Sequence, residues 1–161
     1  YTLSLHDALP ILLCIMYCVF FVVHQQFNMP GFYLFIQDLI IIGFSEEYLY
    51  RGVMYSIMKK ENTALAIVLS SLFRGITHAV YPTVVVGGDL SVFLTDCISN
   101  IGFGLFIGYG FIYVFEESKT LWIPILLHAV YDYSMGYGWI IFVGTVMYLY
   151  IVNKGGHTRQ K

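Results

Sequence analysis

Long apolar runs separated by short polar breaks dominate this chain. Apolar spans cover residues 32–58, 63–80, 91–115, 121–133 and 138–152, and a shorter run of twelve covers residues 12–23. Inside a bilayer every backbone polar group must be satisfied within its own segment, so spans of this length are helices. The alternating pattern of a membrane barrel is absent. We therefore predict an all-α, polytopic transmembrane helix bundle.

Composition supports a lipid environment. Hydrophobic residues make up 58% of the 161 residues and charged residues only 11%, whereas soluble domains carry about 25% charged residues. The lipid bilayer is therefore an expected partner. The net charge of −2 and the lack of a basic stripe exclude nucleic acid. Cys14, Cys18 and Cys97 lack metal-type spacing, so we expect them to be small buried hydrophobic residues.

The first residues do not read as natural protein. Residues 1–11 (YTLSLHDALPI) resemble a translated sequencing adapter, so we expect them to be an artefact and give His6 and Asp7 no role. The bundle is then N-terminally truncated, and residues 12–30 are the remnant of an N-terminal transmembrane helix and its loop. Residues 31–152 form the membrane core, and residues 153–161 form a polar basic tail.

Basic residues orient the spans. We place on one side of the membrane the following residues: Lys59, Lys60, Lys119, Lys154, Arg159 and Lys161. The positive-inside rule makes that side, and with it the C-terminus, cytoplasmic. The loops around Pro82 and Gly136 then face outward. Gly104 and Gly108 provide a small-residue face for close helix packing.

Ionisable residues interrupt the apolar spans. They are Glu46, Glu47, Arg51, Arg74, His78, His128 and Asp132. A charge at the centre of a spanning helix costs about 2.5–3.5 kcal/mol on insertion scales, and such residues face the bundle interior and mark a site. We expect Glu46, His78 and His128, from three separate helices, to converge on one water-accessible cavity. His24, at the end of a helix, is given no role.

Helical geometry divides the two glutamates. Glu47 and Arg51 are four residues apart and can pair, whereas Glu46 lies about 140° from Arg51 around the helix. One glutamate is then structural and the other is available for chemistry. Alternatively, both glutamates form an ion-pair network with Arg51 and Arg74. A carboxylate in a low-dielectric cavity can act as a general base, and a histidine can stabilise an oxyanion. The residue types suit peptide hydrolysis.

Four short motifs occur in a defined order on separate apolar segments. They are Glu46-Glu47-Tyr48-Leu49-Tyr50-Arg51 (EExxxR), Ser70 to His78 (close to FxxxH), Asn100-Ile101-Gly102-Phe103-Gly104 (NxxxG) and His128-Ala129-Val130-Tyr131-Asp132 (HxxxD). Together they resemble the CPBP family of CAAX-protease and bacteriocin-processing (Abi-type) membrane proteins. The resemblance covers residues 31–144.

The resemblance implies an intramembrane endopeptidase that cleaves a peptide or membrane-anchored protein. We expect it to lie in the bacterial plasma membrane and to need no cofactor. The resemblance also implies that Glu46 and His78 activate water and that His128 and Asp132 bind the oxyanion or orient the carbonyl. Supporting roles fall to Glu47, Arg51, Arg74 and Asn100. Two departures stand out. Arg74 replaces the motif's phenylalanine, and Asp132 replaces an asparagine. Because an ionised aspartate cannot donate a hydrogen bond to an oxyanion, we expect Asp132 to orient His128 instead.

Two alternatives stay open. Glu46, His78 and His128 could form a zinc site of two histidines and one carboxylate with an open position for water, which would make zinc a cofactor of the same protease. The chain could instead be a non-catalytic bacteriocin-immunity or partner-binding membrane protein that uses the polar cluster as a binding pocket.

Overall fold

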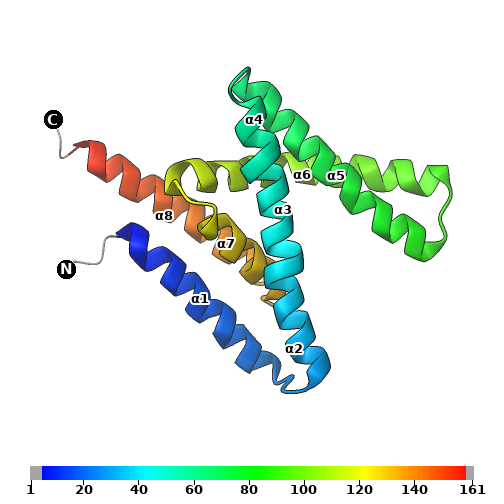
Figure 1. The fold of residues 1–161 in the computed structure, drawn as a ribbon, viewed down its shortest axis with the longest axis horizontal. Helices are drawn as coiled ribbons and strands as arrows, with labels where there is room; N and C mark the ends of the chain where they lie inside the picture. Colours follow the sequence, from blue (N-terminus) through cyan, green and yellow to red (C-terminus); the bar gives the residue numbers. More distant parts are fainter. Residues whose placement is uncertain (1–4, 159–161) are drawn as a thin grey trace. The chain divides into compact units, whose positions relative to one another are not determined.

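The computed structural model describes residues 5–158, and all regular secondary structure in this range is helical (Figure 1). The all-α prediction is confirmed. The elements are α1 (Leu5–His24), α2 (Met29–Ile36), η1 (Gln37–Phe44), α3 (Ser45–Glu47), η2 (Tyr48–Tyr55), α4 (Ser56–Met58), α5 (Thr63–Val86), α6 (Leu90–Ser118), α7 (Trp122–Tyr133) and α8 (Gly138–Thr158).

The elements from α2 to α3, together with Tyr48, form one continuous helical rod, and the rest of η2 and α4 follow it in sequence. Asn28 begins the rod, because the side-chain Oδ1 of Asn28 accepts a hydrogen bond from the Gly31 amide at 2.9 Å. Two π-helical stretches, η1 and η2, lie on either side of the short α-helical turn α3, which contains both glutamates. Such i→i+5 stretches are rare and often occur at functional sites.

The chain forms two compact units. The first comprises α1, α2, η1, α3, the last residues of α6, and all of α7 and α8. Tyr48, the first residue of η2, also belongs to this unit, and the second unit comprises the rest of η2, α4, α5 and most of α6.

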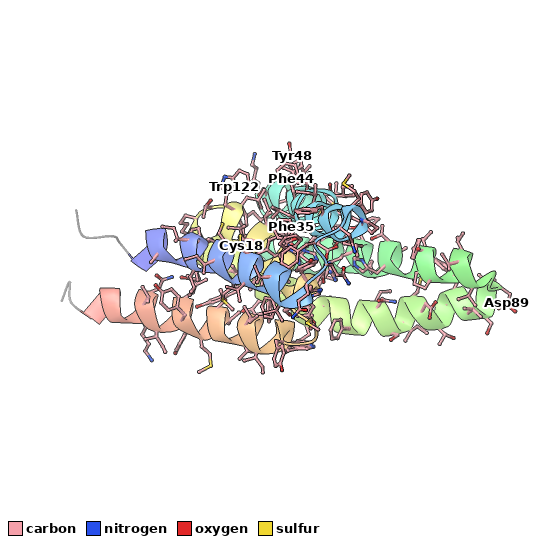
Figure 2. All side chains as sticks on the ribbon, turned by 90° about the horizontal axis from the view of Figure 1, so that it is seen from below. Cys18, Phe35, Phe44, Tyr48, Asp89 and Trp122 are labelled. Carbon is pink, nitrogen blue, oxygen red and sulfur yellow. The ribbon has the colours of Figure 1, made fainter. Side chains whose placement is uncertain are left out.

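Helix α7 is the core of the first unit. Every residue from Ile123 to Val130 is buried, with α1, η1 and α8 packed around the helix. Its sequence is apolar on all sides, as expected of a buried helix. Gly43 lets η1 approach closely, because a Cβ at that position would lie 3.1 Å from the carbonyl oxygen of Ile125. On the same rod Phe44 stacks with Tyr48 and lies near Trp122 at the start of α7 (Figure 2).

Helices α5 and α6 form the hairpin of the second unit. Both are long and apolar enough to cross a membrane. Gly87 ends α5 in the left-handed region (φ 69°), and the Asp89 carboxylate accepts hydrogen bonds from the amides of Ser91 and Val92 at the turn (Figure 2). The helices meet at the predicted small-residue face, where Gly104 and Gly108 lie against Ser71.

Two helices extend further than predicted. The loop expected from Tyr81 is wrong, because α5 continues through Pro82 to Val86; a proline removes only one helical hydrogen bond, and membrane helices tolerate it. Helix α8 continues from residue 152 to Thr158 and takes in part of the predicted tail. Arg159 and Lys161 lie outside the described residues.

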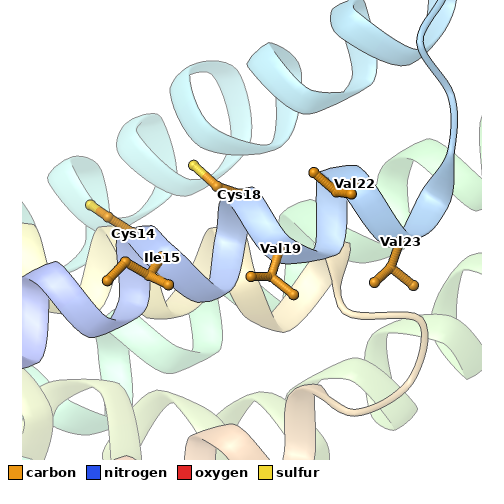
Figure 3. A pocket seen from close by; sticks show the side chains of 6 residues that line it. All are labelled: Cys14, Ile15, Cys18, Val19, Val22 and Val23. Atoms are coloured by element: carbon orange, nitrogen blue, oxygen red, sulfur yellow. The ribbon is translucent and has the colours of Figure 1, made fainter.

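The cysteines correct one expectation. Cys97 is buried as predicted, but Cys14 and Cys18 are exposed. They line an open apolar groove of about 420 Å³ along α1 together with Ile15, Val19, Val22 and Val23 (Figure 3). The expectation of burial fails because it assumes water outside the helix, whereas hydrocarbon solvates an exposed thiol or methyl group without a hydrophobic penalty.

A close backbone contact between α5 and α6 gives a stability prediction. A Cβ on Gly75 of α5 would lie 2.8 Å from the Cα of Ile101 on α6, so Gly75→Ala forces two backbones apart. We expect a loss of about 1–3 kcal/mol, the usual cost of overpacking. Thermal unfolding in detergent measures it. Gly102→Ala is the matched control, because a Cβ there meets nothing within 4 Å; equal losses for both variants would contradict the contact.

Candidate active site

The centre of the site is a buried imidazole held by a buried carboxylate. His128 lies in the middle of α7, and its Nδ1 is 2.7 Å from Oε1 of Glu47 on α3. The two side chains are 2% and 0% exposed. Charge-assisted hydrogen bonds of this length are among the strongest in proteins. Glu47 therefore fixes the rotation of the His128 ring.

The second ring nitrogen faces two further carboxylates. Nε2 of His128 lies 3.4 Å from Oδ2 of Asp132, one turn further along α7, and 3.9 Å from Oε2 of Glu46. Asp132 and Glu46 are 33% and 23% exposed. The Nε2 side of the imidazole thus faces two partly exposed side chains, although Oε2 of Glu46 itself is buried.

The two adjacent glutamates both reach His128. Helical geometry alone separates them by about 100°, which suggested that only one would belong to the site. The imidazole ring resolves this, because its two nitrogens point in different directions. Glu47 takes Nδ1 and Glu46 lies on the Nε2 side. Because an ionised carboxylate can only accept a hydrogen bond, Nδ1 of His128 has to carry a proton when it bonds to Glu47.

Asp38 is a carboxylate near the site that the sequence analysis missed. It lies in η1, half-buried, and interacts electrostatically with Asp132, His128 and His24. A signal was available, because Asp38 is a lone carboxylate in an apolar run, eight residues before Glu46 on the same rod. Asp38 adds a fourth carboxylate to the surroundings of His128.

In the second unit, His78 has a defined tautomer. Its Nδ1 lies 2.9 Å from the carbonyl oxygen of Arg74. A carbonyl can only accept, so Nδ1 donates and Nε2 keeps its lone pair. Nearby, the Thr77 hydroxyl donates to the same carbonyl at 2.9 Å and lies 2.5 Å from the Tyr50 hydroxyl. The Arg74 carbonyl and the Tyr50–Thr77 hydroxyl pair thus set the polar surroundings of His78.

The supporting residues of the second unit have partners of their own. The Arg51 guanidinium is buried and lies 5.1 Å from the ring centre of Phe111. Asn100 donates its Nδ2 to the carbonyl of Asp96 at 2.8 Å. The pairing of Glu47 with Arg51, the supporting role of Arg74, and the convergence of His78 with Glu46 and His128 stay predictions.

Comparison with known families decides the class of this protein. The model of the type II CAAX prenyl endopeptidase Rce1-like family matches residues 27–134. The chain belongs to this family. The match spans all four motifs and supports the resemblance to CAAX proteases drawn from them. No curated protein and no solved structure matches the chain.

Family membership has consequences at a general level. Rce1-like proteins are membrane-integral proteases, so this chain is a membrane protein of a hydrolase family with a protein or peptide as its class of substrate. Among the residues that the structure describes, no three side chains of histidine, cysteine, aspartate or glutamate are grouped to hold a metal ion. The zinc alternative is therefore a question for experiment.

Proposed function

We propose that this protein is an intramembrane endopeptidase that hydrolyses a peptide bond of a membrane-associated protein or peptide, with a water activated by Glu46 and His78. The observation that carries the proposal is the buried His128 imidazole with Glu47 on Nδ1 and Glu46 and Asp132 on the Nε2 side. Membership of a CAAX endopeptidase family supports the reaction class.

In the proposed reaction Glu46 is the general base. It takes a proton from water while the water oxygen attacks the carbonyl carbon of the peptide, and it later gives that proton to the leaving amine. The lone pair on Nε2 of His78 accepts the second hydrogen of the same water and holds it for attack. This step requires His78 and Glu46 to share one water.

His128 is the proposed oxyanion partner. Glu47 holds Nδ1, so a ring protonated on both nitrogens presents Nε2–H on its other side, where the carbonyl oxygen of the substrate gains negative charge. Asp132, 3.4 Å from Nε2, stabilises that protonated ring and orients it. Asp132 needs no proton of its own in this role, which agrees with aspartate at a position where the family motif also permits asparagine.

Cleavage of a defined probe tests the proposal. The intact protein in liposomes is incubated with a peptide that ends in a farnesylated cysteine and three further residues, or with the unmodified peptide, and products are identified by mass spectrometry. We expect cleavage by the wild type and none by His78→Ala, while Glu61→Gln in the exposed 59–62 loop cleaves normally. Cleavage that survives both His78→Ala and Glu46→Gln would refute the mechanism. Retention of a biological phenotype by both variants would favour partner binding.

Chelation separates the metal-free and zinc-dependent versions. We expect 1,10-phenanthroline to leave the rate of cleavage unchanged, because carboxylate and imidazole groups suffice for the proposed steps. The measurement is the initial rate with chelator and after addition of zinc. Inhibition by the chelator that zinc reverses would establish the zinc-dependent version.

Asp38→Asn tests the fourth carboxylate. Its negative charge favours the protonated His128 ring, so the amide should lower kcat about three- to tenfold, an effect of about 1 kcal/mol that is typical of a partly solvated charge pair. Steady-state kinetics on the farnesylated peptide measure it. Asp38→Glu keeps the charge and should retain most of the activity; equal rates for Asp38→Asn and wild type would remove Asp38 from the site.

We place the protein in the bacterial plasma membrane with its C-terminus in the cytoplasm. The support is the distribution of lysine and arginine at the ends of the spans. Fusion of the C-terminus to a reporter that is active only in the cytoplasm tests this orientation, and an inactive reporter on a stably inserted protein would reverse it.

A further inference from the structure

Helix α7, which contains His128, is short and ends at a buried residue. With twelve residues, α7 is about 18 Å long, too short to cross a bilayer alone, and its last residue, Tyr133, is buried. The last carbonyl groups of a helix have no partner within it, and an unpaired carbonyl away from water is costly. The end of α7 therefore needs a cap from outside the helix.

His24 supplies that cap. As the last residue of α1, it places Nε2 2.9 Å from the carbonyl oxygen of Tyr133. The carbonyl only accepts, so Nε2 of His24 donates. Two helices far apart in sequence are thus joined end to end through one side chain.

Ring packing reinforces the hydrogen bond. The imidazole of His24 stacks on the ring of Tyr133 with centroids 4.3 Å apart and planes 9° apart. Tyr17 and Phe35 pack on the same tyrosine ring at 5.3 and 5.8 Å. The junction therefore fixes both the carbonyl and the side chain of Tyr133.

The backbone on both sides of the junction is strained. Gln25, directly after His24, has φ 53°, and Met135, two residues after Tyr133, has φ 55°. Residues other than glycine rarely adopt this left-handed region, and such conformations persist where the surrounding contacts determine them. The two left-handed residues thus lie on either side of the His24–Tyr133 contact.

We propose that His24 is a positioning residue of the active site, which acts by capping the Tyr133 carbonyl and so fixing the last turn of α7. That turn contains Asp132, and His128 lies one turn earlier. The inference rests on the proposed peptidase function. His24 precedes the region 27–134 matched by the family model. The Glu47–His128 hydrogen bond and the His128–Asp132 contact both depend on the rotation and height of α7.

Two substitutions separate the two parts of the contact. His24→Phe keeps a ring that can stack on Tyr133 but has no donor, whereas His24→Gln keeps an N–H donor at a matching distance from the backbone and loses the ring. We expect His24→Phe to lower kcat about tenfold with KM unchanged, and His24→Gln to stay within about threefold of the wild type, because small misplacements of reacting groups cost rate. Tyr133→Phe is the control, since its buried hydroxyl has no hydrogen-bond partner among the described residues.

A second readout does not need activity. In protein with ¹⁵N-labelled histidine, the His128 ring resonances should shift in His24→Phe and not in His24→Gln. Unchanged kcat and unchanged His128 resonances in His24→Phe would overturn the proposal. Equal losses of kcat in His24→Phe and His24→Gln, in proportion to a loss of thermal stability, would also overturn the proposal, because they would indicate a purely structural role for His24. If the wild type cleaves no probe, the proposed function fails, while the resonances still decide whether His24 positions His128.

Discussion

Glu46→Gln is expected to lower kcat for the farnesylated peptide about 10³-fold, within the range that general-base catalysis contributes. The amide has nearly the shape of the carboxylate but cannot accept the proton of water. Glu46 is 23% exposed on the Nε2 side of His128, at 3.9 Å from that nitrogen. In the proposed reaction one water contacts both side chains. The measurement is single-turnover cleavage, which isolates chemistry from product release.

The same variant should fold normally. A partly exposed carboxylate at 3.9 Å from an imidazole contributes about 0–1 kcal/mol to stability, so the melting temperature in detergent should change little. KM should also stay near the wild-type value, because the proposed role of Glu46 is in the transition state rather than in binding. Full cleavage by well-folded Glu46→Gln would exclude Glu46 as the base and leave the position to another carboxylate, Asp132 or Asp38.

Much of this arrangement could be predicted from the sequence, because charged groups in apolar spans have few explanations. Glu46, Glu47, His128 and Asp132 attract attention for this reason alone, and the structure brings them together. The apolar run Ile123 to Val130 likewise predicts a helix buried on all sides. Position in an apolar span is thus a strong signal, since the cost of an unpaired charge there is large.

The details of pairing could not be predicted. The π-helical stretches around α3 have no sequence signature, and ideal α-helical angles placed Glu46 and Glu47 in separate environments. Which carboxylate binds which ring nitrogen depends on the rotation of α7 relative to the rod. That rotation is set by packing, with Gly43 against the backbone of Ile125 and His24 against Tyr133.

His24 shows a second limit of sequence reasoning. A single histidine at the end of an apolar helix has no neighbour in sequence that indicates its partner, and Tyr133 is 109 residues away. The need for a cap becomes visible only when the end of α7 is known to be buried. Asp38 was missed for a related reason, because its relation to His128 is spatial and no motif contains it.

Glu47→Leu is expected to lower the free energy of unfolding by about 3–5 kcal/mol, the usual cost of removing one partner of a buried pair. The variant leaves Nδ1 of His128, 2% exposed, without the carboxylate at 2.7 Å. Glu46→Leu is the matched control: the same substitution one residue earlier, at a partly exposed position, should cost about 1 kcal/mol or less. These results would give the two adjacent glutamates different roles, with Glu46 important mainly for rate and Glu47 mainly for stability.

A double-mutant cycle with His128→Leu isolates this pair. Replacing both partners by apolar side chains removes the buried polar groups together, so Glu47→Leu/His128→Leu should be more stable than the sum of the single losses predicts, by about 1.5 kcal/mol or more. Denaturation in mixed detergent micelles gives the four free energies. Additive losses would mean that the 2.7 Å hydrogen bond does not hold the ring, and Glu47 would then stabilise the protein through other contacts. A coupling of the expected size would establish that the imidazole at the centre of the site is fixed by Glu47, so that Nε2 faces Glu46 before substrate binds.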